Sequence, residues 1–374
     1  MVFCGNVVDN TAAMGRIRRG CFVVCVNVAV FLGLFALAEL THRIYRDGFV
    51  GAFANLVRFS SVPYSNLGTG NWVIYDKELG YRLNPNRPGI NSLSLRHGTI
   101  AIPKPPGLHR SIVLGDSIPW DPDGFVKLMS ERRDRPGVHE TINASVPGYT
   151  TYQEITFFKR YVLQTDPDLV IWSYCLNDNH KFLHQFDEKG GMLATPEAMD
   201  SLAIHNYWDV IVSRSYLLSS VWFRIMAYVE QHKNEDRSKF VWERKPDFNV
   251  AWKDVYWNSY EEYLKEMLRV LGDKNANLAL VIFPYEPQLD YRDDKVNYEY
   301  AVKPQHILHV LCEKYKVRCL DLYPIFSRAY DGGEKLYRDG IHLNDAGHQL
   351  TAATLDDFLV ANKLLPPPRS RPTT

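Results

Sequence analysis

Two short stretches far apart in the chain carry residue types that can catalyse acyl transfer. Residues 111–118 read Ser-Ile-Val-Leu-Gly-Asp-Ser-Ile, an apolar run that ends at Gly115 and delivers Ser117 into a turn. Near the other end, Asp339 stands three residues before His342. A hydroxyl nucleophile needs a base within hydrogen-bonding distance, and that base needs a partner that fixes its tautomer and stabilises its charged form. The two stretches therefore predict a serine nucleophile, a histidine base and an aspartate that orients the base.

Ser117 on its own also has a structural explanation. A Gly-Asp-Ser triplet is expected by chance in roughly one chain in ten of this length, and a serine at the start of a helix commonly caps it. In the same way, Asp116 and Asp178 are interpreted as turn-stabilising residues, and Asp345 as the cap of the last helix. The nucleophile hypothesis therefore depends on the second stretch, because a cap needs no distant histidine.

Further residues extend the pattern in a fixed order. Four blocks follow one another: Gly115-Asp-Ser-Ile118, Asn143-Ala-Ser-Val-Pro-Gly148, Asn177-Asp178 and Asp339-Gly-Ile-His342. In residue type and order they resemble the SGNH/GDSL hydrolase family over roughly residues 109–360. The resemblance implies that Ser117 is the nucleophile and that Asp339 and His342 complete a catalytic triad. It also implies an oxyanion hole formed by the backbone N–H groups of Ser117 and Gly148 and by the side-chain amide of Asn177.

The third block departs from the family pattern. That block usually reads Gly-x-Asn-Asp, whereas this chain has Cys175-Leu-Asn-Asp178. A side chain at the position where glycine is usual either narrows the site or tilts Asn177. The local structure at Cys175 therefore decides whether the amide can serve the oxyanion hole.

Strand and helix patterns alternate from residue 110 onwards. Short apolar runs are typical of buried strands, and amphipathic segments are typical of helices. Such alternation predicts a parallel central sheet between helices, a three-layer α/β/α domain, and the resemblance implies the flavodoxin-like form of this fold. All the candidate site residues are predicted to follow strand ends, where open α/β sheets form their crevices. The predicted strands are 110–114, 140–143, 168–174, 278–283 and 318–321, and the predicted helices are 124–131, 151–164, 259–271, 304–316 and 346–363.

The amino-terminal region contains an almost uniformly apolar stretch. Residues 21–40 are interrupted only by Asn27 and Glu39, and about 20 apolar residues are enough to cross a bilayer as a helix. We predict a transmembrane helix over 21–43, preceded by a cytoplasmic segment, 1–20, whose three arginines favour that orientation. The alternative is a secretory signal cleaved after Ala38. Both interpretations export the catalytic domain to the periplasm or the extracellular space.

The rest of the chain divides by composition. Residues 47–108 are rich in turn-forming residues and predict a small β-rich preface packed on the catalytic domain. The catalytic domain, 109–363, carries an insertion, 182–258, whose aromatic residues indicate either a lid over the crevice or a helical cap that fills the core. The proline-rich tail, 364–374, is predicted to be disordered.

Composition excludes several classes of protein. Lysine plus arginine equals aspartate plus glutamate at 43 each, so no basic excess indicates nucleic-acid binding. His180 and His184 have a helical spacing used in metal sites, but no acidic residue accompanies them. Together with the absence of Cys-x-x-Cys, this predicts neither a metal nor a cofactor.

Cys312 and Cys319 either form a disulfide, if the domain is exported, or remain two buried thiols.

Together these observations predict a membrane-anchored, exported serine esterase. Its substrates would be acyl esters, acetyl esters among them, of small molecules or glycans. An O-acyltransferase acting on cell-surface glycans would use the same triad. A third hypothesis is a catalytically inactive, membrane-tethered binding protein, which only the Cys175 departure favours.

Overall fold

The computed structural model describes residues 8–54, 72–183, 185–186, 192–193, 215, 217–218, 221 and 240–365. The chain divides into two compact units, one of Met1–Val62 with Asn206–Glu235 and the other of Pro63–His205 with Asp236–Thr374. Most of the predicted insertion 182–258, and the predicted disordered tail beyond residue 365, lie outside the described residues. The candidate catalytic residues all belong to the second unit.

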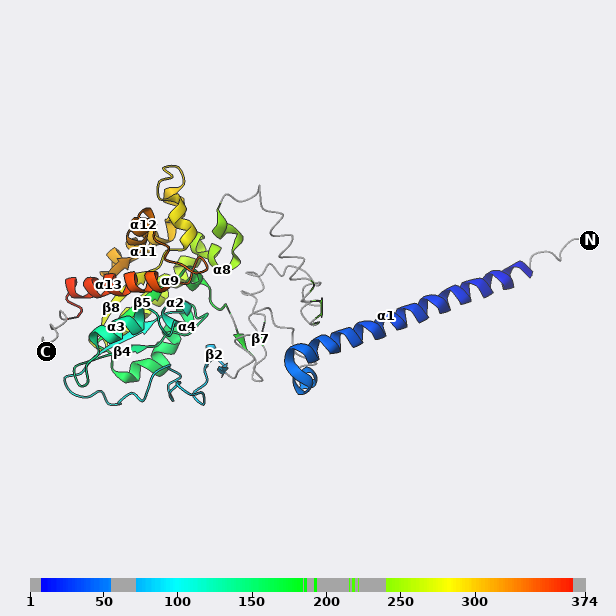
Figure 1. Ribbon diagram of the computed structural model, residues 1–374, viewed down its shortest axis with the longest axis horizontal. Helices are drawn as coiled ribbons and strands as arrows, with labels where there is room; N and C mark the ends of the chain where they lie inside the picture. The colour runs from blue at the N-terminus through cyan, green and yellow to red at the C-terminus, as the bar shows by residue number, and fades with distance from the viewer. Residues whose placement is uncertain are drawn as a thin grey trace, which may run out of the picture. The chain divides into compact units, whose positions relative to one another are not determined.

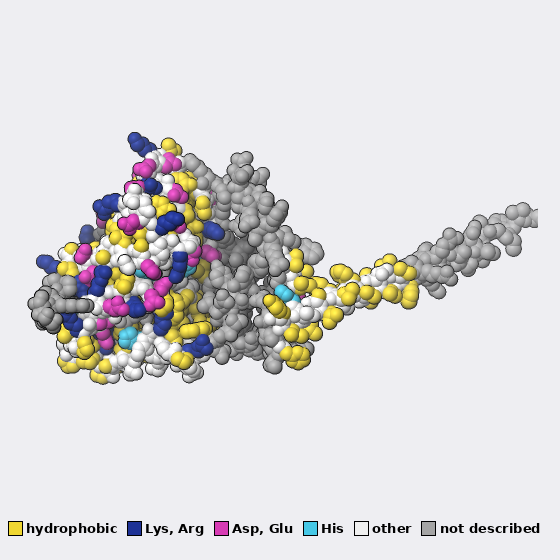
Figure 2. All heavy atoms as spheres, viewed as in Figure 1, with side chains coloured by type: hydrophobic (Ala, Val, Ile, Leu, Met, Phe, Trp, Pro, Cys, Tyr) yellow, Lys and Arg dark blue, Asp and Glu magenta, His cyan; other side chains and the backbone are white. Residues whose placement is uncertain are grey.

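The first unit is built on one long helix, α1 (Val8–Ala54), which begins inside the predicted cytoplasmic segment and continues beyond residue 43 (Figure 1). Its stretch Phe22–Tyr45 has a mean hydropathy of 2.3 and is long and apolar enough to cross a membrane. The hydrophobic side chains of this stretch are exposed (Figure 2). The Glu39 carboxylate forms an ion pair with Arg43 at 2.7 Å. It also accepts hydrogen bonds from Ser215 Oγ at 2.7 Å and the Leu217 N–H at 2.8 Å, which offsets the cost of an acidic group in an apolar helix.

A five-stranded parallel sheet forms the centre of the second unit. Its strands are β3 (His109–Leu114), β4 (His139–Asn143), β5 (Leu169–Tyr174), β8 (Asn277–Ile282) and β9 (Arg318–Asp321). Their order is β4-β3-β5-β8-β9, so the direction of winding reverses between β3 and β5. In doubly wound sheets, ligands bind at the carboxyl ends of the strands beside such a point. The predicted parallel sheet of flavodoxin-like order is confirmed.

Helices cover both faces of this sheet (Figure 1). They are α3 (Phe125–Arg133), α4 (Thr151–Phe157), α9 (Asp254–Gly272), α11 (Lys303–Tyr315), α12 (Tyr323–Asp331) and α13 (Asp345–Ala361). Side chains alternate along each strand: Ile112 and Val170 pack with α4, α9 and α11, whereas Val113 and Ile171 pack with α3, α12 and α13. The three-layer α/β/α architecture is therefore confirmed.

The preface contributes a hairpin that is fastened to the catalytic domain. Strands β1 (Val73–Asp76) and β2 (Gly80–Leu83) pair antiparallel, and α4 lies against them. The Tyr149 hydroxyl donates to the Tyr81 carbonyl at 2.6 Å, and Gln153 Nε2 donates to the Leu79 carbonyl at 2.7 Å. All four residues are buried, so these bonds satisfy polar groups that water does not reach.

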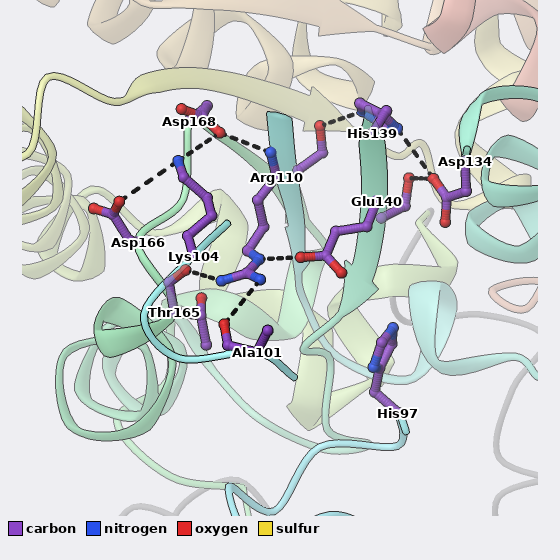
Figure 3. Close-up of polar contacts among 12 residues, drawn as sticks. His97, Ala101, Lys104, Arg110, Asp134, His139, Glu140, Thr165, Asp166 and Asp168 are labelled. Carbon is purple, nitrogen blue, oxygen red and sulfur yellow. Dashed lines mark hydrogen bonds and ion pairs between the residues drawn. The ribbon is translucent and has the colours of Figure 1, made fainter. Parts of the chain in front are cut away.

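A second part of the preface is fixed at the amino ends of the strands (Figure 3). The Arg110 guanidinium is fully buried in β3 and pairs with the Glu140 carboxylate of β4. It also donates to the carbonyl oxygens of Thr165 and, at 3.1 Å, Ala101. Lys104 forms an ion pair with Asp168 at 2.8 Å. Residues 72–83 and 101–104 therefore contact the same sheet from its opposite ends.

The described part of the insertion forms core structure. The short helices η5 (Val241–Arg244), α8 (Pro246–Asn249) and η6 (Val250–Trp252) lead into α9. Trp242 is fully buried and stacks on Trp252 with ring centroids 4.8 Å apart, and Trp257 Nε1 donates to the Ala251 carbonyl at 2.9 Å. Residues 240–258 are therefore helical and packed into the core. Earlier in the insertion, strands β6 (Gln185–Phe186) and β7 (Met192–Leu193) pair antiparallel. The choice between a lid and a helical cap for the insertion as a whole stays open.

Cys312 and Cys319 form a disulfide. The bridge joins the last turn of α11 to strand β9, with Cα atoms 6.3 Å apart. The sequence left the choice between a disulfide and two thiols open, because spacing alone does not reveal the distance between two side chains.

Candidate active site

The first component of the site is the turn after β3. At Gly115 a Cβ would lie 2.6 Å from Pro119 Cγ and 2.8 Å from Ser173 Cβ, so only glycine fits. The short helix α2 (Ser117–Trp120) begins directly at the candidate nucleophile. Its cap is Asp116, whose Oδ1 accepts the Ile118 N–H at 3.1 Å. The alternative interpretation of Ser117 as the cap is therefore wrong, and its hydroxyl is available for another partner.

The second component is a tight loop closed by a bridge between Tyr337 and Leu343. Asp339 Oδ1 accepts the backbone N–H groups of His342 at 2.8 Å and Ile341 at 3.3 Å, which shapes the loop around the two candidate residues. Helix α12 separates this loop from β9. The prediction that Asp339 and His342 directly follow a strand is therefore wrong, and the loop is held at the sheet edge by Glu286, whose N–H donates to the Gly340 carbonyl at 2.9 Å.

These two components meet. His342 Nε2 lies 2.9 Å from Ser117 Oγ, and His342 Nδ1 lies 2.7 Å from Asp339 Oδ2. This is the arrangement that a serine nucleophile, a base and an acid that orients the base would require. The Asp339 side chain keeps about half of its surface exposed, at 51%, and that of His342 keeps 29%. The carboxylate is therefore partly solvated while it remains bonded to the ring.

The environment favours the ionised form of Asp339. Burial raises the pKa of this carboxyl, but the backbone N–H and the ring of His342 outweigh that effect and bring the pKa below its ordinary value. An ionised carboxylate accepts only, so the ring nitrogen that faces it must carry a proton. His342 Nε2 is then the lone-pair nitrogen that faces Ser117 Oγ in the neutral ring.

An ion pair connects the two components a second time. Arg338 lies in the loop and pairs at 3.0 Å with Asp121, which directly follows α2. Burial raises the pKa of Asp121, but the Asp123 N–H, His348 and Arg338 together lower it below its ordinary value. This pair could not be predicted from the sequence, because neither residue belongs to a motif and the two segments meet only in the fold.

Backbone donors lie beside the nucleophile. Gly148 follows β4 with φ +74°, and within the described part of the chain neither its N–H nor that of Ser117 donates to a protein acceptor. Asn143 Nδ2 donates to the Pro119 carbonyl at 2.6 Å, which connects the end of β4 to helix α2. Both N–H groups are therefore free to bind a ligand oxygen, at the ends of two neighbouring strands.

Asn177 lies close to the nucleophile turn. It is buried in a short 3-10 helix, Leu176–Asn179, directly after β5, and its side chain helps to lower the pKa of Asp116 against the effect of burial. Its amide NH₂ has two hydrogens, so at least one remains for a ligand oxygen beside any contact with Asp116. Cys175 is buried with an extended backbone (φ −122°), and its N–H donates to Asp178 Oδ2 at 2.8 Å. The cysteine therefore needs no glycine-like backbone, and Asp178 stabilises the local turn as expected.

Three carboxyl groups are buried beneath this edge of the sheet. Burial raises the pKa of Asp116, Glu154 and Asp178. Charge repulsion from Asp116 raises the pKa of Glu154 further, and repulsion from both raises that of Asp178. The pKa of Glu154 reaches about 8 although Trp172 Nε1 donates to its Oε2 at 2.6 Å. At neutral pH the cluster therefore holds protons.

A second Ser-His-Asp arrangement lies at the opposite ends of the strands (Figure 3). Ser111 Oγ is 3.0 Å from His139 Nε2, and His139 Nδ1 is 3.1 Å from Asp134 Oδ1. Ser111 is only 1% exposed, in the middle of strand β3, so a substrate carbonyl does not reach it. Accessibility, and not the hydrogen bonds, distinguishes Ser117 from Ser111.

The structure thus brings together all five residues of the predicted site at the carboxyl edge of the sheet, in two groups. Ser117, His342 and Asp339 form a bonded chain, and Gly148 and Asn177 follow the strands on either side of β3.

The cap of α13 is Asn344, not Asp345, because the Asn344 side chain accepts the Gly347 N–H. Among the described residues no group of His, Cys, Asp or Glu side chains is arranged to hold a metal ion; His180 is buried beside Tyr256, and His184 lies outside those residues.

Comparison with known proteins identifies one family. The sequence model of the GDSL-like lipase/acylhydrolase family matches residues 113–350. Similar solved structures include the acetyl xylan esterase AlAXEase, with 17% identity over 66% of this chain and 97% of that chain (TM-score 0.39). They also include LAE5, an alpha/beta hydrolase enzyme from the metagenome of Lake Arreo, with 15% identity over 68% and 95% (0.41), and TesA, with 16% over 69% and 100% (0.39). A search among curated proteins found no match.

Proposed function

The chain belongs to the GDSL-like lipase/acylhydrolase family, and from that membership we propose that this ester-bond hydrolase acts through Ser117, His342 and Asp339. The observation that carries the proposal is the hydrogen-bonded chain from Ser117 Oγ to His342 Nε2 at 2.9 Å and from His342 Nδ1 to Asp339 Oδ2 at 2.7 Å. Substrates would be acyl esters of small molecules or carbohydrates.

The reaction follows from the positions of these atoms. His342 Nε2 takes the proton of Ser117 Oγ as the oxygen attacks the ester carbonyl, and Asp339 stabilises the imidazolium that forms. The imidazolium then returns the proton to the departing alcohol, which leaves an acyl group on Ser117. Water, deprotonated by the same nitrogen, releases the acid and restores the serine.

The negative charge of the tetrahedral intermediate needs fixed donors. The Ser117 and Gly148 N–H groups, which have no acceptor among the described residues, would bind the oxyanion together with the remaining N–H of the Asn177 amide. Removal of one such donor typically costs about 2.7–4 kcal/mol of transition-state stabilisation. Preorganisation of these donors is therefore a large part of the proposed rate enhancement.

We also propose that α1 anchors the enzyme and that the catalytic unit is exported. The mean hydropathy of 2.3 over Phe22–Tyr45 supports a membrane-spanning helix. The Cys312–Cys319 disulfide supports an oxidising compartment, because such bonds persist mainly outside the cytosol. Fractionation of cells followed by mass spectrometry of the intact chain tests the anchor: an uncleaved chain in the membrane fraction is expected, and a soluble chain that begins after Ala38 would contradict it.

The catalytic proposal is tested with the full-length chain in detergent. Hydrolysis of p-nitrophenyl esters is measured for the wild type, Ser117→Ala and His342→Ala, together with Ser111→Ala as the matched control from the buried arrangement. A fluorophosphonate probe, which labels activated serines whatever the natural substrate, provides a second readout by peptide mass spectrometry. Loss of both signals in the first two variants, with Ser111→Ala retaining them, is expected. Label on any serine other than Ser117 would contradict the mechanism.

A further inference from the structure

The preface hairpin forms one wall of a cavity of about 280 Å³. Its contribution consists of Trp72, Val73, Tyr81 and Leu83, so that both strands β1 and β2 take part. Tyr81 and Leu83 are buried, and Tyr81 is fixed by hydrogen bonds to both sides of Gly148, through the Pro147 carbonyl at 2.6 Å and the Tyr149 hydroxyl at 2.6 Å. This wall lies outside residues 113–350, the part of the chain that the family match covers.

The opposite walls lead directly into the proposed catalytic residues. Trp120 is the last residue of helix α2, which Ser117 begins, and one helical residue advances the chain by only about 1.5 Å. Val146 and Pro147 immediately precede Gly148. The cavity is therefore lined by residues that neighbour Ser117 and Gly148 in the chain.

The lining is suited to hydrocarbon. Of the described residues that line the cavity, only Arg96 is charged, and the others are aromatic, aliphatic or proline. The Arg96 guanidinium stacks on the Trp120 ring at 4.0 Å and donates to the Trp120 carbonyl, so it is already engaged. A sugar ring would bring hydroxyl groups that need several polar partners, and this lining offers few. An acyl chain needs none.

The position of the cavity indicates which half of an ester enters it. The departing alcohol must lie at His342 Nε2, because that nitrogen donates its proton. Of the described residues, those that line the cavity all precede Gly148 in the chain, and none comes from the loop 337–343. That loop reaches the segment after α2 at the Arg338–Asp121 ion pair, but no residue of the loop is among the described residues that line the cavity. The cavity is therefore assigned to the acyl half of the ester and not to the alcohol at His342 Nε2.

We propose that this cavity binds the acyl chain of the substrate, and that the enzyme prefers esters of acids with several methylene groups over acetyl esters. This inference rests on the proposed function. A cavity of about 280 Å³ is close to the lower limit of ~300 Å³ for small-molecule sites, and the two carbons of an acetyl group would leave most of it empty. Each methylene buried from water increases kcat/KM by roughly fourfold.

The test is a chain-length series on the full-length protein in detergent. For p-nitrophenyl acetate, butyrate, hexanoate and octanoate, kcat/KM is expected to rise by roughly fourfold per methylene until the cavity is full. Val73→Phe fills the cavity from the hairpin, and we expect the ratio of octanoate to acetate turnover to fall at least about tenfold. Ile74→Phe is the matched control, because the next side chain of β1 does not line the cavity. Trp72→Ala, which removes a wall instead, is expected to reduce the octanoate preference as well.

Four outcomes separate this inference from the catalytic proposal. Equal kcat/KM for all chain lengths, or a rise that follows the alcohol in a series of alkyl acetates, would overturn the acyl cavity while the triad stands. If no ester is hydrolysed, octanoate is titrated into the Ser117→Ala protein by calorimetry. Octanoate binding that is abolished by the additional change Val73→Phe would support the acyl-binding cavity without supporting the catalytic proposal. Absence of octanoate binding in that case would overturn it.

Discussion

The Tyr81 hydroxyl donates a hydrogen bond of 2.6 Å to the carbonyl oxygen of Pro147, the residue before Gly148. Tyr81 belongs to the preface hairpin, and Gly148 belongs to the loop after β4 that supplies a proposed oxyanion donor. The bond fixes the peptide unit that carries the donor, because the Pro147 carbonyl and the Gly148 N–H belong to the same peptide unit. A residue outside the matched hydrolase region thus helps to position a residue of the site.

Replacement of Tyr81 by phenylalanine is expected to affect catalysis more than stability. The variant leaves the Pro147 carbonyl without its donor, which costs about 1 kcal/mol, and it frees the Gly148 peptide to move. We expect kcat to fall roughly tenfold with little change in KM, because a displaced donor acts on the transition state. Tyr149→Phe is the matched control: it removes a bond of the same type and length to the Tyr81 carbonyl. An equal loss of kcat in both variants would contradict a specific role for Tyr81.

Asp339→Asn is expected to reduce kcat strongly while the fold stays intact. An amide can place its NH₂ toward His342 Nδ1 and so stabilise the wrong tautomer, and the imidazolium loses its charged partner. In serine hydrolases of this design such a change costs on the order of 10³- to 10⁴-fold. Kinetics with p-nitrophenyl butyrate measure the effect, and circular dichroism checks the fold. Asp345→Asn, an exposed acid at the start of α13, serves as control; a decrease below tenfold for Asp339→Asn would refute the orienting role.

Glu154 is expected to make the protein less stable as the pH rises. Burial raises its pKa to about 8 in the folded state, so between about pH 4.5 and pH 8 the folded chain holds a proton that the unfolded chain has released. The contribution of this group to the free energy of unfolding is therefore largest below pH 4.5. It falls by up to about 1.4 kcal/mol for each pH unit between pH 4.5 and pH 8.

Glu154→Gln, a neutral replacement of similar shape, is expected to reduce this pH dependence. Melting temperatures of the full chain at pH 5 and pH 8 measure it. Glu266→Gln is the control: ion pairs with Arg269 and Lys159 lower the pKa of this exposed carboxyl to about 2, so its contribution is lost only when the pH falls below about 4.5. An unchanged difference between pH 5 and pH 8 in Glu154→Gln would show that this carboxyl does not hold the proton.

Gly115→Ala is expected to destabilise the protein and to displace the nucleophile. The added Cβ meets Pro119 Cγ and Ser173 Cβ at distances below 3.0 Å, and such overpacking costs about 1–3 kcal/mol. Gly98→Ala, where nothing lies within 4 Å of the added atom, is the control and is expected to be neutral. Thermal unfolding and fluorophosphonate labelling of Ser117 report the two effects. Normal stability and labelling in Gly115→Ala would show that the turn can shift.

Loss of the Cys312–Cys319 disulfide is expected to lower stability without a direct effect on the triad. Closure of this short loop stabilises by about 2.5 kcal/mol in the chain-entropy account. Thermal unfolding of the Cys312→Ser/Cys319→Ser double variant measures the change, with Cys25→Ser as a control free cysteine. In cells, maleimide should label Cys312 and Cys319 only after reduction. Labelling without reduction would contradict both the pairing and an oxidising location.

Much of the central fold follows from local patterns. Buried strands such as 169–174 are continuous apolar runs, and the observed bounds of β3, β5 and β9 lie within a residue of the predicted ones. Helix α12 (Tyr323–Asp331) was not predicted, because it is short, begins with a Tyr-Pro pair and closely follows strand β9. The predicted helix 151–164 is α-helical only to Phe157 and then continues as π and 3-10 turns, a change of winding that amphipathic spacing does not reveal.

The site was predictable where a motif fixes residue types and unpredictable where only the fold creates a contact. Ser117, Asp339 and His342 stand in recognisable blocks, whereas Arg338 and Asp121 form an ion pair between segments that carry no motif. The hairpin is the clearest example: its residues suggested only a preface, and its contribution arises from a hydrogen bond across 66 positions of sequence.

The attachment of residues 72–104 to the sheet also has a practical consequence for work on fragments. A fragment that began at residue 109, where the hydrolase motifs start, would retain the whole triad. It would lack the carbonyl acceptors of three buried donors. The Tyr149 hydroxyl would lose the Tyr81 carbonyl, Gln153 would lose the Leu79 carbonyl, and Arg110 would lose the Ala101 carbonyl. Each donor that stays shielded from water after this loss costs about 1–3 kcal/mol, a large part of the whole stability of many domains. We therefore expect the smallest autonomously folding piece of this enzyme to start well before its first catalytic motif.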